Sequence, residues 1–259
     1  MKKVQAGLLV CTLLMTLPAS GQDRHPGVIG SDDRQIVSQE GAPWDAVGQV
    51  NIALYNRLTR CTGTLVKPDL VITAAHCVMD PWKKSALPLH AIHFVAGIHA
   101  DSKKGHSIAK CLRFLKDYIY VGPNRILPRA PAQKVPIEAL TRDVVAIVLE
   151  KKLSVEPAAL ARAVIAQPGH KLTHAAFPAD RRHQLTAHFG CQLLRADLFG
   201  PLWFNDCDTH PASSGGPIFV DEGGKLKLAA IMLGGRDRIS NLGLPISEWT
   251  SLTESATCS

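Results

Sequence analysis

Two residues far apart in the chain have the right types and surroundings to act as a nucleophile and its base. His76 lies in the run Thr73–Cys77, and Ser214 lies in the run Ser213–Pro217. A serine hydroxyl is a weak nucleophile at neutral pH, so acyl transfer requires a base within hydrogen-bond reach. Histidine suits this role because its unperturbed pKa of about 6.5 lets it accept and return a proton. The pattern therefore indicates acyl-transfer chemistry.

A third group is needed to orient the histidine. Asp143 directly precedes the apolar run Val144–Leu149, whereas its rivals Asp101 and Asp117 lie near lysines and have no such run. An imidazole base requires a carboxylate that fixes its tautomer and stabilises its charged form. We therefore assign this role to Asp143.

Together these motifs resemble one known family. The runs Cys61–Val66, Val71–Cys77, Asp143–Leu149 and Ser213–Pro217 are similar to those of trypsin/chymotrypsin-family serine proteases. In detail they look most like the bacterial secreted branch, which includes the glutamyl endopeptidases. The resemblance covers roughly residues 36–252 and includes the chain order His, Asp, Ser.

The resemblance implies a fold and an activity. The fold would be all-β, with two six-stranded antiparallel β-barrels, a short C-terminal helix, and the catalytic groups in the cleft between the barrels. The activity would be that of a serine endopeptidase that forms an acyl-enzyme: Ser214 attacks, His76 acts as general base and then acid, and Asp143 orients His76. Neither a cofactor nor a metal is expected.

Two positions depart from the family pattern. The family's oxyanion hole corresponds to the backbone N–H groups of Ala212 and Ser214, but most relatives have glycine in place of Ala212. Many relatives also bury a new Ile-Val amino terminus against an aspartate just before the nucleophile. Here Ile36 and Val37 are present but the aspartate is replaced by Ser213. A buried ammonium without a partner is costly, which argues against that mode of activation.

These departures keep an alternative open, namely a catalytically weak protein of protease fold that binds peptides or a partner. An esterase is disfavoured, because the Gly-x-Ser-x-Gly elbow fails at Ala212 and the order of the triad is that of the protease family.

The resemblance gives two conflicting indications of specificity. Asp208 occupies the place where the trypsin branch recognises basic residues, whereas Thr209 fits the glutamyl branch. Met232 stands where the glutamyl branch uses a histidine, so the specificity stays open. A substrate strand would pair with an edge at Leu233. The expected substrate-binding residues are Asp208, Thr209, Leu233, Gly234, Gly235 and Gly243.

Short apolar runs rich in β-branched residues, separated by turn residues, predict strands. In the first half these runs are Val50–Leu54, Cys61–Val66, Leu70–Thr73, Ala91–Ala96, Ile108–Leu115 and Val144–Leu149. In the second half they are Ala163–Ala166, Lys171–Phe177, Gln184–Leu194, Ile218–Val220, Leu226–Leu233 and Leu242–Ile246. A hairpin turn is expected at Gly223–Gly224, and a closing helix over residues 247–252 with Ser247 as its cap.

The order of the segments predicts four regions. Residues 1–21 read as a signal peptide, with Lys2 and Lys3 ahead of an apolar run that is too short to span a bilayer. Residues 22–35 look like an exposed leader or propeptide. Residues 36–150 would form the barrel with the histidine and aspartate, and residues 151–259 the barrel with the serine. Prolines make residues 122–136 a long surface loop.

Composition fits a secreted globular protein. Hydrophobic residues make up 46% and charged residues 20% of the chain, which argues against disorder. Loss of the signal peptide lowers the formal charge from +7 to +5, and the basic residues are scattered without interleaved aromatics. We therefore expect a monomer that acts on proteins or peptides and binds neither nucleic acid nor, once processed, membranes. Its location would be secreted or periplasmic.

Of the seven cysteines, Cys11 lies in the signal peptide, so six remain in an oxidising compartment. Six cysteines predict three disulfides in one of fifteen pairings. The family resemblance implies Cys61 with Cys77. Cys191 with Cys207 is the second choice, which leaves Cys111 with Cys258. A metal site is disfavoured, because the chain has no Cys-x-x-Cys pair and no His-Glu-x-x-His run.

Overall fold

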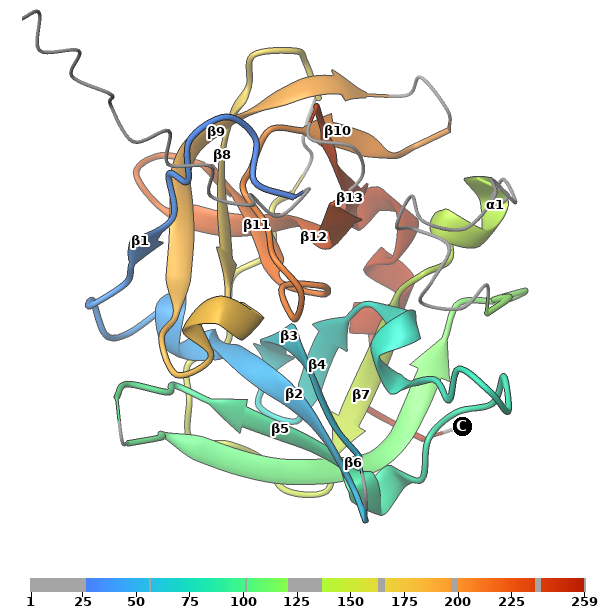
Figure 1. Ribbon diagram of the computed structural model, residues 1–259. Coiled ribbons are helices and arrows are strands. Elements are labelled where there is room, and N and C mark those ends of the chain that lie inside the picture. The colour runs from blue at the N-terminus through green and yellow to red at the C-terminus, as the bar shows by residue number, and fades with distance from the viewer. Residues whose placement is uncertain are drawn as a thin grey trace, which may run out of the picture.

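The computed structural model describes residues 27–55, 57–100, 102–120, 137–162, 166–196, 200–235 and 239–258. The chain forms two closed antiparallel β-barrels packed against each other (Figure 1). The predicted fold class is confirmed. The predicted signal peptide, Asp101 and the predicted proline-rich loop over residues 122–136 lie outside the described residues.

The first barrel contains all six strands predicted for the first half of the chain. Its strands β4 and β7 are buried along their whole length, because they lie in the core with side chains on both faces covered. Around the barrel the order is β2-β3-β4-β7-β6-β5. The bounds are β2 Val47–Leu54, β3 Arg57–Lys67, β4 Leu70–Thr73, β5 Ile92–Ala96, β6 Gly105–Phe114 and β7 Val145–Leu149.

The second barrel runs β8-β9-β10-β13-β12-β11 and closes through pairing of β11 with β8, while β1 (Gln35–Ile36) adds to β9 outside the ring. Gly223 and Gly224, at φ 67° and 79°, form the predicted hairpin turn between β11 and β12. The bounds are β8 Lys171–Ala176, β9 Thr186–Ala196, β10 Trp203–Asn205, β11 Pro217–Asp221, β12 Leu226–Gly235 and β13 Asn241–Pro245.

The sixth strand of this barrel differs from the prediction. It is β10, which has only three residues and is too short for an alternating pattern to reveal. The run predicted as a strand, Ala163–Ala166, lies mostly outside the described residues, and Ala166 itself is not in a strand.

The helical segments are short. The predicted C-terminal helix is present as two 3-10 segments, and Ser247 lies inside the first of them and does not cap a helix. The break falls at Trp249, whose backbone is non-helical at φ −135° and whose buried indole N–H donates to the Leu244 carbonyl. The other short elements are α1 Ile137–Leu140 and the 3-10 segments η1 Trp44–Ala46, η2 Ala75–Val78, η3 Leu89–Ala91 and η5 Ala179–Arg181.

Residues 27–34, here called the strap, are exposed at 30–33, as expected of the leader, but are buried at both ends. Val28 is 6% exposed and Arg34 is 8% exposed. Asn241 of β13 donates to the Gly27 carbonyl at 2.8 Å, and Gly27 also accepts from the Thr209 amide at 2.9 Å. The strap therefore packs on the second barrel through backbone hydrogen bonds, which leave little trace in a polar sequence.

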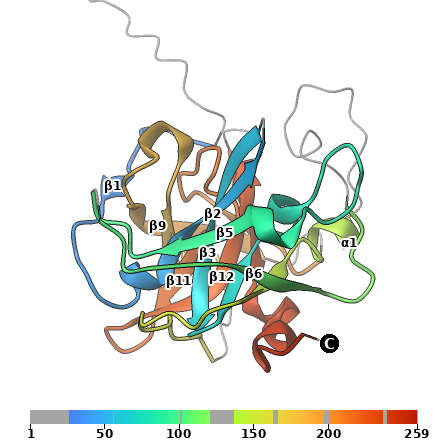
Figure 2. The same cartoon turned by 90° about the horizontal axis from the view of Figure 1, so that it is seen from below.

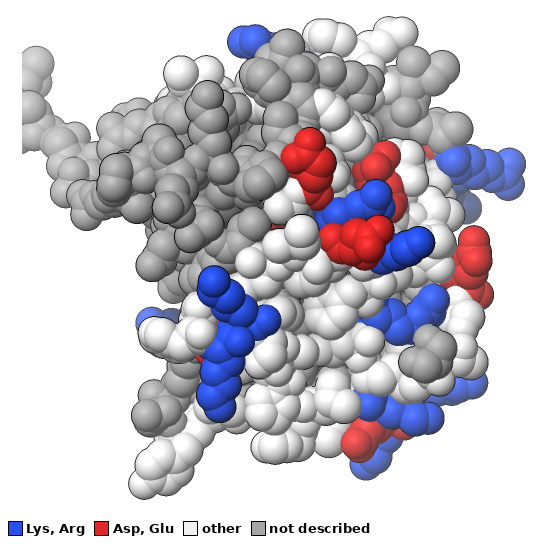
Figure 3. Space-filling view, turned by 90° about the vertical axis from the view of Figure 1, so that its right-hand side faces the viewer, with Lys and Arg blue, Asp and Glu red and all other residues white. Residues whose placement is uncertain are grey.

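Among the described residues, no helix is long and apolar enough to cross a membrane. On the face shown in Figure 3, basic and acidic side chains lie close to one another and do not form a patch of one sign.

All three predicted disulfides are present: Cys61–Cys77, Cys111–Cys258 and Cys191–Cys207. The second joins β6 of the first barrel to the C-terminal segment, which lies at the lower edge of the view in Figure 2. Arg113 supports the same connection by donating to the carbonyls of Leu252 and Ser255. The C-terminal segment thus returns from the second barrel to the first.

We predict that removing this long-range bridge destabilises the protein more than removing a short-range one. Cys111 and Cys258 are 147 residues apart, whereas Cys61 and Cys77 are 16 apart. In the chain-entropy model the lost stabilisation is about 5 kcal/mol for the former and about 3 kcal/mol for the latter. Thermal unfolding of the two double-alanine variants measures this. An equal or smaller fall in Tm for Cys111→Ala/Cys258→Ala would contradict the prediction.

Candidate active site

His76 and Asp143 meet where two neighbouring strands of the first barrel begin and end. His76 lies in η2, just after β4, and Asp143 lies two residues before β7, which pairs with β4. One carboxylate oxygen of Asp143 lies 2.7 Å from His76 Nδ1, and the other accepts the His76 backbone N–H at 2.8 Å. Because Asp143 is 2% exposed, this contact fixes both the ring and the backbone of His76. The rival Asp117 lies exposed at φ 60°.

This pairing sets the protonation of the imidazole. Burial works to lower the pKa of His76, but the adjacent Asp143 carboxylate raises it, and the net pKa lies above its ordinary value. The charged imidazolium is therefore favoured by its partner, as expected for a base that must hold a proton during a reaction.

Ser214 is brought to this pair from the second barrel. Its backbone carbonyl accepts the Thr62 N–H at 3.0 Å and lies 3.8 Å from Cys77 Sγ, next to His76. Its hydroxyl donates to the Leu233 carbonyl at 3.1 Å. In this rotamer the proton points toward Leu233, so transfer to His76 requires the hydroxyl to turn.

The glycines after Ser214 permit close approach of the backbone. Gly215 has φ 79°, and a Cβ there would lie 2.0 Å from Thr73 Oγ1. At Gly216 a Cβ would lie 2.6 Å from the Ala175 carbonyl oxygen. Both positions require glycine, which explains this part of the motif.

Ala212 adopts φ 75°, a left-handed conformation that glycine adopts without strain. Its carbonyl accepts the Thr62 hydroxyl at 2.9 Å, which helps hold this conformation. Within the described part of the chain, neither the Ala212 N–H nor the Ser214 N–H donates to a protein acceptor. Two backbone donors therefore stay available beside Ser214.

Asp208 is 1% exposed, and its carboxylate is matched by the strap. One oxygen accepts the Ile29 N–H and the other the Asp33 N–H, each at 2.8 Å. The imidazole of His188 lies 3.4 Å away. Burial works to lower the pKa of His188, but Asp208 raises it. Asp208 thus serves as an anchor for the strap in this structure.

The other predicted substrate-binding residues lie near the strap or in the barrel. Thr209 is 2% exposed, and a Cβ on Gly235 would lie 2.7 Å from Gly27 Cα. Gly234, at φ 155°, follows a bulge in β12. A Cβ on Gly243 would lie 2.7 Å from Ile218 Cδ1, so that glycine accommodates core packing.

Ser213 and Ile36 are the two positions that bear on trypsin-type activation. Ser213 is 1% exposed and its hydroxyl accepts the His210 N–H at 3.3 Å. Ile36 is 56% exposed and pairs with Thr186 at the outer edge of β9.

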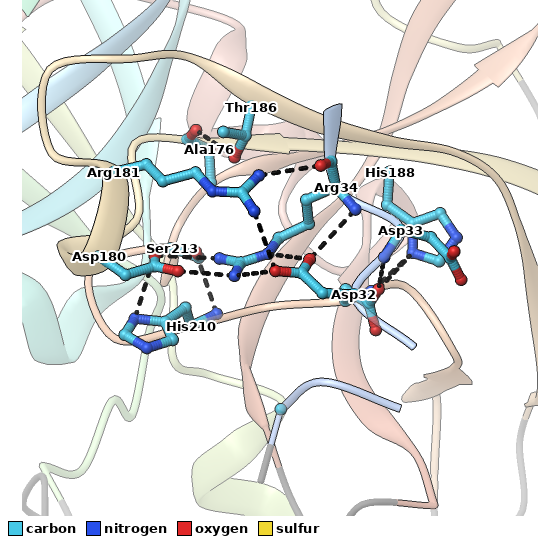
Figure 4. Close-up of polar contacts among 12 residues, drawn as sticks. Asp32, Asp33, Arg34, Ala176, Asp180, Arg181, Thr186, His188, His210 and Ser213 are labelled. Carbon is cyan, nitrogen blue, oxygen red and sulfur yellow. Dashed lines mark hydrogen bonds and ion pairs between the residues drawn. The ribbon is translucent and has the colours of Figure 1, made fainter. Parts of the chain in front are cut away.

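The sequence reasoning missed Thr62 and a charged network around Arg34. Figure 4 shows Arg34 between the carboxylates of Asp32 and Asp180, with His210 on the far side of Asp180. Partial burial works to raise the pKa of Asp180, but Arg34 outweighs it and the net pKa is lowered. In the sequence, Arg34 lies in a polar leader and Asp180 is followed by Arg181. Both patterns are typical of a solvated surface, so neither indicated this network.

A second histidine-aspartate pair lies away from this site. His99 Nε2 is 2.8 Å from Asp45, which also binds Lys104 at 2.7 Å. The contact of His99 ties the loop after β5 to η1.

Solved structures of known proteins share this fold. A Glu endopeptidase, in a structure with MPD, aligns with a TM-score of 0.67 at 19% identity, over 88% of this chain and 96% of that one. The protease Anisep from Arthrobacter nicotinovorans aligns with a TM-score of 0.60 at 18% identity, over 86% and 100%. At such identities the likeness shows the fold alone.

Sequence comparison identifies the family. The vitellin-degrading protease of Bombyx mori is 40% identical over 76 residues, which are 28% of this chain and 26% of that protein. The chain thus matches about a quarter of the length of this curated relative. The sequence model of the trypsin-like peptidase domain matches residues 61–226, well over half of the chain. The protein therefore belongs to the trypsin-like family of serine peptidases.

Proposed function

We propose that the protein is a serine endopeptidase whose triad is Ser214, His76 and Asp143. The observation that carries the proposal is the double contact of the buried Asp143 with His76, at 2.7 Å to Nδ1 and 2.8 Å to the backbone N–H. This contact leaves Nε2 as the ring nitrogen that accepts a proton. Family membership supports peptide bonds as the substrate.

The reaction follows from these groups. Ser214 Oγ attacks the peptide carbonyl carbon while His76 Nε2 takes the hydroxyl proton, and the N–H groups of Ala212 and Ser214 stabilise the resulting oxyanion. Collapse of the intermediate breaks the C–N bond, and His76 gives its proton to the leaving amine. Water, activated by His76, then attacks the acyl-enzyme, releases the carboxylic acid and restores Ser214.

We also propose that the protein is exported. Its three disulfides account for all six cysteines outside the proposed signal peptide. Disulfides of this kind persist in oxidising compartments.

A fluorophosphonate probe tests the proposed nucleophile. We expect labelling at Ser214 in the parent, none in Ser214→Ala, and a kcat for peptide hydrolysis that falls roughly a millionfold in Ser214→Ala. Mass spectrometry locates the label. Peptide hydrolysis that persists in Ser214→Ala would show another nucleophile, and a folded parent that is neither labelled nor active would favour the peptide-binding alternative.

The pH profile tests the role of Asp143. His76 must be neutral to act as a base, so kcat/KM should rise with pH through a pKa above the ordinary value of histidine. In Asp143→Asn burial remains while the charge is lost, so the acid limb should move to lower pH and kcat should fall about 10⁴-fold.

The raised pKa of His76 also makes stability depend on pH, but in the opposite sense to activity. A folded-state pKa above the unfolded one gives stabilisation that is present at low pH and lost as pH rises through the folded value. The free energies of unfolding of the parent and of Asp143→Asn, measured across this pH range, should therefore converge at high pH. An unchanged acid limb in Asp143→Asn would contradict the assignment.

Ala212 provides a test of the oxyanion hole. Ala212→Gly should keep or raise kcat, because glycine adopts φ 75° without strain. Ala212→Val should lower kcat by about 100- to 1,000-fold, because a β-branched residue disfavours this conformation and displaces the donor. Steady-state kinetics, with Tm as a check on folding, measure both. Equal kcat in the two variants would exclude this N–H from catalysis.

A further inference from the structure

The loop from His210 to Ser213 presents one of the two proposed oxyanion donors, yet it lacks the buried ion pair that holds the corresponding loop in many relatives. Ser213 stands in place of the aspartate that would pair with such an ammonium. Some other interaction must hold Ala212 at φ 75°, because a non-glycine residue does not favour this conformation.

Asp180 is the charged residue that reaches this loop. Its Oδ1 lies 3.4 Å from His210 Nδ1, and the preceding residue, Ala179, donates its N–H to the Pro211 carbonyl at 2.7 Å. The turn η5 thus holds the loop by one backbone contact and one side-chain contact, on the side opposite Thr62.

Asp180 is itself held by Arg34 of the strap. Arg34 donates to both oxygens of Asp180, at 2.7 and 3.1 Å, and to both oxygens of Asp32, each at 2.8 Å (Figure 4). The Arg34 side chain is only 4% exposed. A planar guanidinium bound to two carboxylates has little freedom to move, so it fixes the direction of the Asp180 carboxylate.

We propose that Asp180, oriented by the buried Arg34, is a positioning residue that acts through His210 to hold the Ala212 N–H toward the substrate oxyanion. This inference rests on the proposed function for its kinetic consequence. Its structural part, the ordering of the 210–213 loop, does not. The strap thereby takes the role that an internal ion pair at the residue before the nucleophile has in many relatives.

Asp180→Asn and Asp32→Asn form a matched pair for testing this. Each carboxylate binds Arg34, and their exposed fractions are 33% and 34%. Only Asp180 contacts the serine loop. We expect kcat to fall about 10- to 100-fold in Asp180→Asn, with KM within about twofold of the parent, because a small displacement of a catalytic group lowers the rate without loss of binding. In Asp32→Asn kcat should stay within about threefold.

His210 provides a second test. If Asp180 acts through it, His210→Phe should lower kcat to a similar extent, and the double variant should be no slower than either single one, since residues of one network are not additive. Equal falls in kcat for Asp180→Asn and Asp32→Asn, each in proportion to its fall in Tm, would overturn the proposal and leave the network a purely structural one.

Hydrogen exchange separates this proposal from the proposed function. Amides of the segment 208–216 should exchange about 10-fold faster or more in Asp180→Asn than in the parent, and at the parental rate in Asp32→Asn. Should the parent prove to hydrolyse nothing, this difference would still show that Asp180 orders the loop. If exchange in 208–216 is the same in both variants, Asp180 does not position the loop, whatever the protein catalyses.

Discussion

Thr62 makes the contact on which the site depends, because it joins the serine loop of one barrel to the wall of the other. Its N–H donates to the Ser214 carbonyl and its hydroxyl to the Ala212 carbonyl. Its own carbonyl accepts the Thr73 hydroxyl at 2.7 Å, three residues before His76. One fully buried residue thus sets the distance between the segment that carries the proposed base and the segment that carries the proposed nucleophile.

The neighbouring disulfide strengthens the same junction. Cys61 precedes Thr62 on β3, and Cys77 follows His76 in η2. The bond therefore closes the loop that carries the histidine onto the strand that holds the serine loop. Hydrogen bonds alone contribute about 1 kcal/mol each, and a covalent tie limits how far the two segments separate when one of those bonds opens.

Some features of the structure could be predicted from the sequence and others could not, for physical reasons. The strands of the first barrel were accessible because short apolar runs rich in β-branched residues record local requirements. The contact of His76 with Asp143 and the disulfides were accessible because the motifs resemble those of a family, which implies how these residues are arranged. The strand β10, the packing of the strap on the second barrel, and the Arg34–Asp180 pair were not. Asp180 lies 146 residues from Arg34, and a charge paired at that distance in sequence has the same composition as one exposed to water. Backbone contacts such as those of Asp208 leave no pattern at all.

The strap also connects two questions that the sequence posed separately, the missing aspartate at Ser213 and the acid at Asp208. Ile29 and Asp33 donate their amides to Asp208, and Arg34 directly follows. The carboxylate of Asp208 therefore fixes the position of the strap on the second barrel. In that position Arg34 reaches Asp180. Asp208 thus anchors the strap, and it also lies where the resemblance places a specificity residue. In our proposal the strap then acts on the serine loop through one contact, that of Arg34 with Asp180.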